Sequence, residues 1–180
     1  MKEREKLDGL NPQGQIPFLK DGDWTLGQGN AILKYLAATY EAGKKFVPED
    51  IQTRATMNSW LDYAATDVRS TAMGVMKVRA LWKMFGGPEP SEEEIKVAEE
   101  KLAKTLGVVE KQLAGKEYLT GANITLADLR AWAEIDMLTM VLKKDFAEFP
   151  NTKAWLDRIN ALPEAAGPRN AALETLAAMQ

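Results

Sequence analysis

The spacing of apolar residues changes at Pro48, and that change constrains the fold of this chain more than any other feature. Before Pro48, two short apolar segments at 16–20 and 24–26 flank Asp21-Gly22, a dipeptide typical of hairpin turns. After Pro48, apolar residues recur at helical spacing for most of the remaining chain. The sequence therefore predicts a β-hairpin followed by a helical region.

One helix is expected between these two parts. Residues 27–29 (Gly-Gln-Gly) end the second apolar segment, and a helical apolar face then follows, formed by Ile32, Tyr35, Leu36 and Tyr40. Residues 1–10 are expected to form a helix end or a leading loop, and residues 43–48 a linker. The predicted fold class is mostly α. A partial β-β-α segment would occupy residues 1–43 and an all-helical domain residues 48–180.

Two capping boxes mark helix starts in the second part. Ser91 with Glu94, and Thr125 with Asp128, have the three-residue spacing at which hydroxyl and carboxylate satisfy each other's backbone N–H groups. Further helices are expected to start near Pro150 and at 171–178, and residues 50–84 to form one long helix or two. The side chains expected in the core are Leu102, Leu106, Leu126, Leu129 and Trp155.

The chain contains no cysteine and no histidine, which removes several kinds of chemistry. Disulfides, metal sites built on Cys or His, thiol nucleophiles and Ser-His-Asp triads are excluded, and we expect no metal. A net charge of −3 gives no reason to expect a nucleic-acid partner. No apolar run is long enough to span a membrane, and no signal peptide opens the chain. We expect a cytoplasmic protein, with an organelle left open because the true N-terminus is in doubt.

Four segments, read in order, resemble motifs of the cytosolic glutathione transferases. Residues 11–19 (NPQGQIPFL) resemble NPxGxVPxL, and 26–36 (LGQGNAILKYL) resemble L-x-[EQ]-S-x-A-I-x-x-Y-L. Residues 123–128 resemble the family's capping-box motif, and 149–163 its later P-x-x-x-x-W…P stretch. The resemblance covers essentially the whole chain. It is closest to the phi-like branch and, more distantly, to the gamma subunit of translation elongation factor 1.

The resemblance implies a thioredoxin-like first domain that takes glutathione as a ligand. Pro17 would follow a cis peptide bond, and Ile16 would offer its backbone to the cysteinyl part of glutathione as an added strand does. Gln28 and Gly29 would hold the γ-glutamyl carboxylate at a helix start, although Gly29 stands where the family has a serine. Gln15 completes this set. Two alternatives stay open: an ordinary edge-strand start at 16–17, and a glycine-capped helix that binds nothing.

The family opens with a β-α-β unit that carries its catalytic Ser, Tyr or Cys, and here the first motif already begins at Asn11. The resemblance therefore assigns no catalytic residue to this chain. A lone two-stranded hairpin is marginal in water, so we expect another chain, or a second copy in a homodimer, to cover its open edge. An incomplete sequence and a rebuilt small domain are the alternatives.

Met76, Arg79 and Trp82 are candidates for an acceptor-substrate pocket, because methionine and aromatic side chains near position 80 suit a loose apolar site. They suit a core or an interface equally well. The predicted function is a glutathione transferase-like binding or scaffold subunit of a larger assembly, without catalytic activity on its own. The alternative is a glutathione transferase that conjugates glutathione to electrophiles, with its catalytic N-terminal segment outside this sequence.

Overall fold

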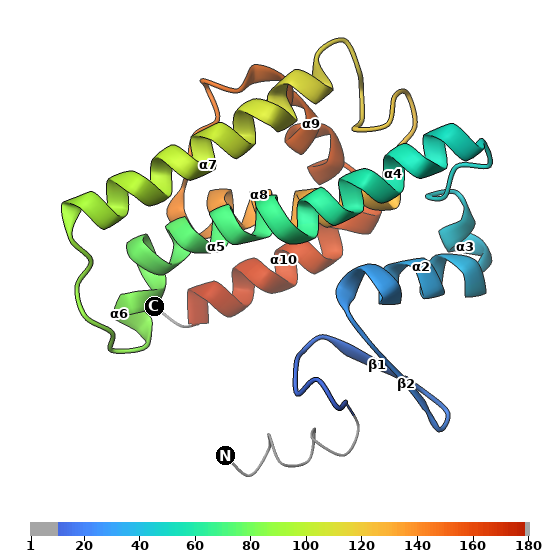
Figure 1. The fold of residues 1–180 in the computed structure, drawn as a ribbon, viewed down its shortest axis with the longest axis horizontal. Coiled ribbons are helices and arrows are strands. Elements are labelled where there is room, and N and C mark those ends of the chain that lie inside the picture. Colours follow the sequence, from blue (N-terminus) through green and yellow to red (C-terminus); the bar gives the residue numbers. More distant parts are fainter. Residues whose placement is uncertain (1–10, 179–180) are drawn as a thin grey trace.

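A computed structural model describes residues 11–178 of the chain (Figure 1). From residue 11 onward, the first part consists of a two-stranded sheet and two helices. Its elements are β1 (Phe18–Asp21), β2 (Trp24–Gly27), α2 (Gly29–Thr39) and α3 (Glu41–Lys44). The strands pair antiparallel, with Phe18 opposite Gly27 and Asp21 opposite Trp24. The predicted hairpin is present, but its two-residue loop is Gly22-Asp23 rather than Asp21-Gly22, because Asp21 is the last residue of β1. Gly22 adopts a φ of 59°, a conformation that favours glycine.

The second part is entirely helical among the described residues. Its elements are α4 (Ile51–Tyr63), η1 (Ala64–Val68), α5 (Arg69–Met76), η2 (Lys77–Leu81), α6 (Trp82–Met84), α7 (Glu92–Leu113), α8 (Leu126–Leu142), α9 (Pro150–Asn160) and α10 (Pro163–Ala178). Residues 51–84 follow one continuous helical path, in which η1 and η2 are π-helical turns. The predicted mostly α fold, a hairpin and helix followed by an all-helical domain, is confirmed.

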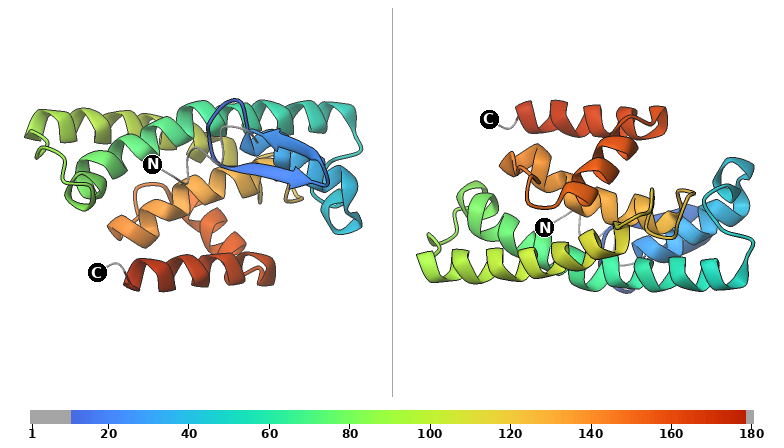
Figure 2. Two further views of the ribbon diagram at one scale, coloured as in Figure 1. Left: turned by 90° about the horizontal axis from the view of Figure 1, so that it is seen from below. Right: turned by 90° about the horizontal axis from the view of Figure 1, so that it is seen from above.

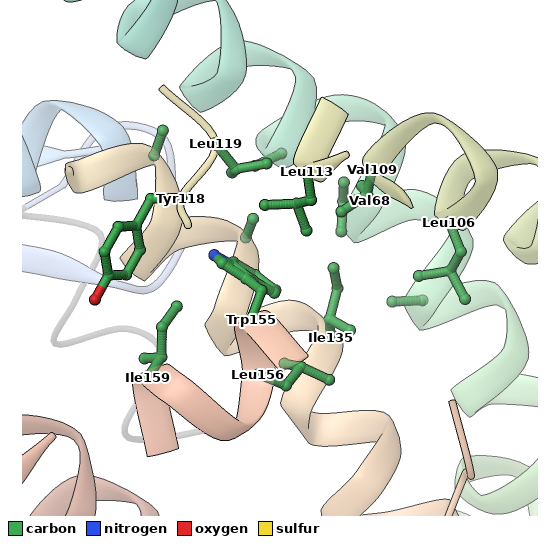
Figure 3. Close-up of a cluster of buried hydrophobic side chains, with 14 of the residues drawn as sticks. Val68, Leu106, Val109, Leu113, Tyr118, Leu119, Ile135, Trp155, Leu156 and Ile159 are labelled. Carbon is green, nitrogen blue, oxygen red and sulfur yellow. The ribbon is translucent and has the colours of Figure 1, made fainter. Parts of the chain in front are cut away.

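The helices are arranged in layers (Figure 2). The path from α4 to α6 lies beside α7, α8 and α9 form the next layer, and α10 lies outside them. The core between these layers is centred on Trp155 (Figure 3). Leu102, Leu106, Leu126 and Trp155 are buried as predicted. Leu129 is only half-buried, because it borders a cavity between the first part and α8.

Both predicted capping boxes are present. At α7, the Glu94 carboxylate accepts hydrogen bonds from Ser91 N (2.8 Å) and Ser91 Oγ (2.9 Å). At α8, Asp128 Oδ2 accepts from Thr125 N (2.8 Å) and Thr125 Oγ1 (3.0 Å). The second box also anchors the core, because Asp128 Oδ1 accepts from the indole N–H of Trp155 at 3.0 Å. The start of α8 is thereby tied to α9.

Several predicted boundaries were wrong. The first strand begins at Phe18 rather than at residue 16, because Pro17 has no N–H to give to a ladder. The final helix begins at Pro163 rather than at residue 171. Proline is favourable in a first helical turn, so Pro163 can start this helix. The segment 43–48 is not all linker, because α3 extends into it.

The buried face of α2 also differs from the prediction. Ala37 is its buried residue and Leu33 packs against the core, whereas Tyr40 lies beyond the helix end with 58% of its surface exposed. The prediction for residues 1–10 lies outside the described residues. Between residues 11 and 178, no helix combines the length and the apolar character that crossing a membrane requires.

Candidate functional site

A hollow of about 950 Å³ lies where the first part meets the helical domain. All five residues predicted from the glutathione motifs line it: Gln15, Ile16, Pro17, Gln28 and Gly29. Its opposite wall consists of Ala65, Arg69, Arg130 and Glu134, which come from η1, α5 and α8. The start of α2, the loop before β1 and the helices η1, α5 and α8 supply its lining. The structure brings the motif residues together, and their role in binding glutathione stays a prediction.

The loop before β1 is a tight turn held by its own hydrogen bonds. The N–H of Gly14 donates to the carbonyl of Asn11 at 2.9 Å, and Asn11 Nδ2 donates to the carbonyl of Gln15 at 2.6 Å. The peptide bond between Ile16 and Pro17 is cis, as the motif predicted. The side chain of Ile16 is 75% exposed. The loop thus presents the backbone of residues 14–17 at the rim of the hollow.

The start of α2 forms the neighbouring wall. Gln28 is the N-cap residue, with φ 71° and ψ 115°. Residues other than glycine rarely adopt this backbone conformation. Its carbonyl accepts the first helical bond, from the N–H of Ile32, at 3.0 Å. Its Nε2 donates to Gln13 Oε1 at 2.7 Å, which ties α2 to the loop before β1. The N–H groups of the first turn then face no helical acceptor, the arrangement that binds anions at helix N-termini.

Gly29 occupies the first helical position of α2, where the motif has a hydroxyl side chain. A Cβ atom built on Gly29 would have no neighbouring atom within 4 Å. The glycine is therefore not required by crowding. A serine hydroxyl would fit here without displacing other atoms.

The charged wall opposite α2 was not predicted from the sequence. Glu134 is 4% exposed, and its Oε1 accepts from Arg69 Nη1 at 2.8 Å and also from Arg130 Nη1. Asn30 joins α2 to the long helix, with its Nδ2 donating to the carbonyl of Leu61 at 2.8 Å. The spacing of Arg130 and Glu134, four residues apart on one helix, is the sequence signal that could have found this pair.

The residues predicted for an acceptor pocket lie elsewhere. Met76 is 3% exposed and belongs to the core. Arg79 pairs with Glu99 on α7, with Nε donating at 2.8 Å. Trp82 is half-buried, and the Lys83 amino group lies 5.4 Å from the centre of its ring. Among the described residues these three do not line the hollow, so the structure does not join them to the glutathione motifs. The acceptor pocket stays a prediction.

No residue lining the hollow within 11–178 carries a hydroxyl or thiol group. Tyr35, the aromatic residue of the α2 motif, donates its hydroxyl to the carboxylate of Asp21 on β1. This hydrogen bond raises the pKa of the Tyr35 phenol above its ordinary value. Tyr35 therefore serves to hold α2 against the hairpin, where Trp24 also packs on its ring with centroids 4.9 Å apart.

Together, the described residues form a helical domain joined to a hairpin-helix unit whose loop backbone and helix start line one hollow. The family model described as "Glutathione S-transferase, C-terminal domain" matches residues 65–163. Glutathione S-transferase F14 of Arabidopsis thaliana is 31% identical over 167 residues, covering 90% of this chain and 65% of the relative. Glutathione S-transferase theta-3 of Mus musculus is 34% identical over 153 residues, covering 84% and 64%.

A solved structure of glutathione S-transferase-I with bound lactoylglutathione superposes with a TM-score of 0.81 at 25% sequence identity. It covers 99% of this chain and 82% of that one. This chain belongs to the glutathione S-transferase family, and its relatives include phi-like and theta members. The chain spans just under two thirds of the length of the two curated relatives.

Proposed function

We propose that this chain binds glutathione in the hollow beside α2 and acts as a binding subunit, without conjugating glutathione on its own. The observation that carries the proposal is the convergence of Gln15–Pro17 with Gln28 and Gly29 on one hollow. The backbone at Ile16 would pair with the cysteinyl unit as an added strand. The N–H groups at the start of α2 would receive the γ-glutamyl carboxylate.

The absence of catalysis is proposed from the chemistry of the lining. Conjugation requires the thiolate of glutathione, and a protein promotes it by placing a hydrogen-bond donor or a positive charge beside the sulfur. No hydroxyl or thiol group lines the hollow within the described residues. The cationic side chains of the lining, Arg69 and Arg130, are held at Glu134, whereas the proposed pairing places the cysteinyl unit at the backbone of Ile16. We therefore expect a ligand to be held with its thiol unactivated.

Calorimetric titration of the full chain with glutathione tests the binding half of the proposal. Replacing Gly29 by Ser should restore one charge-assisted hydrogen bond and tighten binding about 10- to 150-fold. The matched control is Gly107→Ser, because Gly107 on α7 also has no atom within 4 Å of a built Cβ. Unmeasurable binding by both the natural chain and Gly29→Ser would refute the site. Equal affinities in all three proteins would show that glutathione binds somewhere else.

The catalytic half is tested by mixing the chain with glutathione and an aryl halide. The expected rate equals the uncatalysed background. A saturable rate that survives repurification would overturn this half and leave the binding half untouched. The second candidate function, conjugation of glutathione to electrophiles, is favoured by the likeness of the whole chain to transferases such as the one solved with lactoylglutathione. It requires a thiol-activating group from a segment outside this sequence.

We also propose that another polypeptide, or a second copy of the chain, covers the open edge of β1. In the described residues β1 pairs with β2 alone, which leaves one row of backbone groups for a further strand. The chain by itself should therefore self-associate, as measured by light scattering. A monomer whose β1 amides exchange freely while the chain stays cooperatively folded would contradict this proposal.

A further inference from the structure

We propose that Arg69 on α5 is a carboxylate-binding residue of the hollow, anchored by Glu134, whose negative charge Arg130 offsets. It would receive the γ-glutamyl carboxylate from the side opposite α2, and this assignment rests on the proposed function above. The glutathione motifs of the sequence do not include any of these three residues. All three come from the helical domain and line the same hollow as Gly29.

Arg69 has the exposure that a ligand-binding arginine needs. Its side chain is 52% exposed, whereas that of Glu134 is 5% and that of Arg130 is 16% exposed. Its bond to Glu134 uses one nitrogen, Nη1, at 2.8 Å. Nε and Nη2 lie outside that bond, and a guanidinium presents its donors in a planar fork that suits a carboxylate. Arg69 can therefore stay anchored while it binds a ligand.

Arg130 explains why Arg69 retains an effective positive charge. Glu134 is buried, and a buried carboxylate needs a cation to offset its desolvation. Arg130 lies one helical turn before Glu134 and bonds the same oxygen, Oε1. Two guanidinium groups around one carboxylate leave a net charge of about +1 at this wall. The cluster is therefore a fixed cationic site rather than a neutral ion pair.

The polar groups around the cluster also indicate a ligand. Arg130 Nε and Asn30 Oδ1 are buried without a hydrogen-bond partner among the described residues, and both residues line the hollow. Asn30 follows Gly29 at the start of α2, so the cluster and the helix start face each other across one space. Unpaired buried polar groups are uncommon in native proteins, and they concentrate where a ligand or water completes the bonding. The cluster could thus compensate for the missing hydroxyl at Gly29.

The test compares two ligands in four forms of the full chain. Arg69→Gln should weaken glutathione about 10- to 150-fold by calorimetry, because it removes a charge-assisted bond to the carboxylate. Arg69→Lys should fall between it and the natural chain, because lysine keeps the charge but loses the fork. Cysteinylglycine, which lacks the γ-glutamyl unit, should bind all forms equally. Arg158→Gln is the control, because it removes one positive charge from a residue that does not line the hollow. Arg158 lies on α9 and donates to the carbonyl of Glu117.

Each outcome decides between the two proposals. If glutathione binds Arg69→Gln and Arg158→Gln with the same affinity, the inference fails and the proposed function stands. If the natural chain does not bind glutathione, the proposed function fails. L-glutamate then tests the inference alone, through the amide NMR shifts of Gly29 and Asn30. Shifts that appear in the natural chain and vanish in Arg69→Gln support it, and no shift in the natural chain overturns it.

Discussion

The helical domain and the hairpin-helix unit bury their side chains to very different degrees. Five residues of α7 are buried, and α8 contributes eight more, polar ones included. Neither β1 nor β2 has a single buried residue, and α2 has one, Ala37. The difference indicates that burial of apolar surface holds the helical domain together, whereas the hairpin depends on its turn, on Tyr35 and on whatever covers its edge.

The same contrast applies to polar groups. In the helical domain, buried polar atoms belong to closed networks, such as Asp128 with Thr125, Trp155 and the N–H of Leu119. At the boundary with the first part, Asn30 Oδ1 and Arg130 Nε are left without partners among the described residues. A closed network stabilises one structure, and an incomplete one leaves bonds for a ligand. The candidate hollow therefore lies where the better-packed region ends.

The largest effect is expected for Asp128→Ala, which removes the common acceptor of the closed hydrogen-bond network. Asp128 accepts four hydrogen bonds at 2.8–3.0 Å from Leu119 N, Thr125 N, Thr125 Oγ1 and Trp155 Nε1. Removing the carboxylate leaves buried donors unpaired, so the free energy of unfolding should fall by about 3–5 kcal/mol in chemical denaturation. Asp157→Ala, which removes an exposed pair with Lys153, should cost at most about 1 kcal/mol. Equal losses would show that the closed network stabilises the helical domain no more than an exposed ion pair does.

Gly43→Ala should disturb only the hairpin-helix unit. A Cβ on Gly43 would lie 2.6 Å from the Cα of Ala37, so α2 and α3 must separate, at a cost of about 1–3 kcal/mol. Hydrogen exchange should speed up in α2 and stay unchanged in α7. Gly107→Ala is the control in the other region and should stabilise α7 by about 0.5–1 kcal/mol, because its Cβ meets open space. Faster exchange in both regions would show that they unfold as one unit.

Thr125→Ala should have a smaller effect than Asp128→Ala, because it keeps the carboxylate and removes one hydroxyl from the α8 cap. The expected loss is about 0.5–2 kcal/mol by thermal or chemical denaturation. Thr56→Ala, on the exposed side of α4, bonds only the carbonyl of Gln52 within its own helix and should change stability by less than about 0.5 kcal/mol. A loss equal to that of the control would make the capping box incidental.

The smallest effect is expected from Glu110, which caps α9 from α7. Its carboxylate accepts from Asn151 and Thr152, with the two backbone N–H groups at 2.9 and 2.8 Å. Partial burial raises the pKa of Glu110, but these hydrogen bonds outweigh it, so its pKa in the folded chain lies below the ordinary value. Its stabilisation is therefore present above that ordinary value and is lost as the pH falls through the lowered pKa.

Glu110→Gln tests this assignment in unfolding experiments across the acidic range. The natural chain should lose more stability on acidification than the variant, and the two should converge at low pH. The hairpin unit should show no corresponding change in its exchange rates. Parallel curves for the two proteins would show that this cap contributes nothing that depends on protonation.

The sequence predicted much of the fold because its signals are local. The caps at Ser91 and Thr125 and the buried positions Leu102 and Leu106 of α7 depend on residues three or four positions apart, and each was confirmed. The start of α10 was predicted near residue 171, which is too late in the chain. In the structure Pro163 begins the helix and Pro168 lies within it. Proline alone does not say on which side of it the helix lies.

The residues of the candidate site also separate into those that a local sequence pattern predicts and those that it does not. Gln15–Pro17 and Gln28–Gly29 could be found because each set is contiguous and part of a motif, and the cis bond at Pro17 followed from it. Arg69 and Glu134 are 65 positions apart, and no local pattern joins them. Arg69 comes to the hollow only because η1 and α5 pack against α8.

The sequence by itself determined the fold class, the caps and the family motifs, since short-range hydrogen bonds and apolar periodicity are written into neighbouring residues. The tertiary structure alone decided that the two glutathione motifs share one hollow, that Met76, Arg79 and Trp82 stay apart from it, and that a buried Glu134 holds two arginines at its wall. The physical reason is that these placements depend on how the helices pack. Packing joins residues that are distant along the chain.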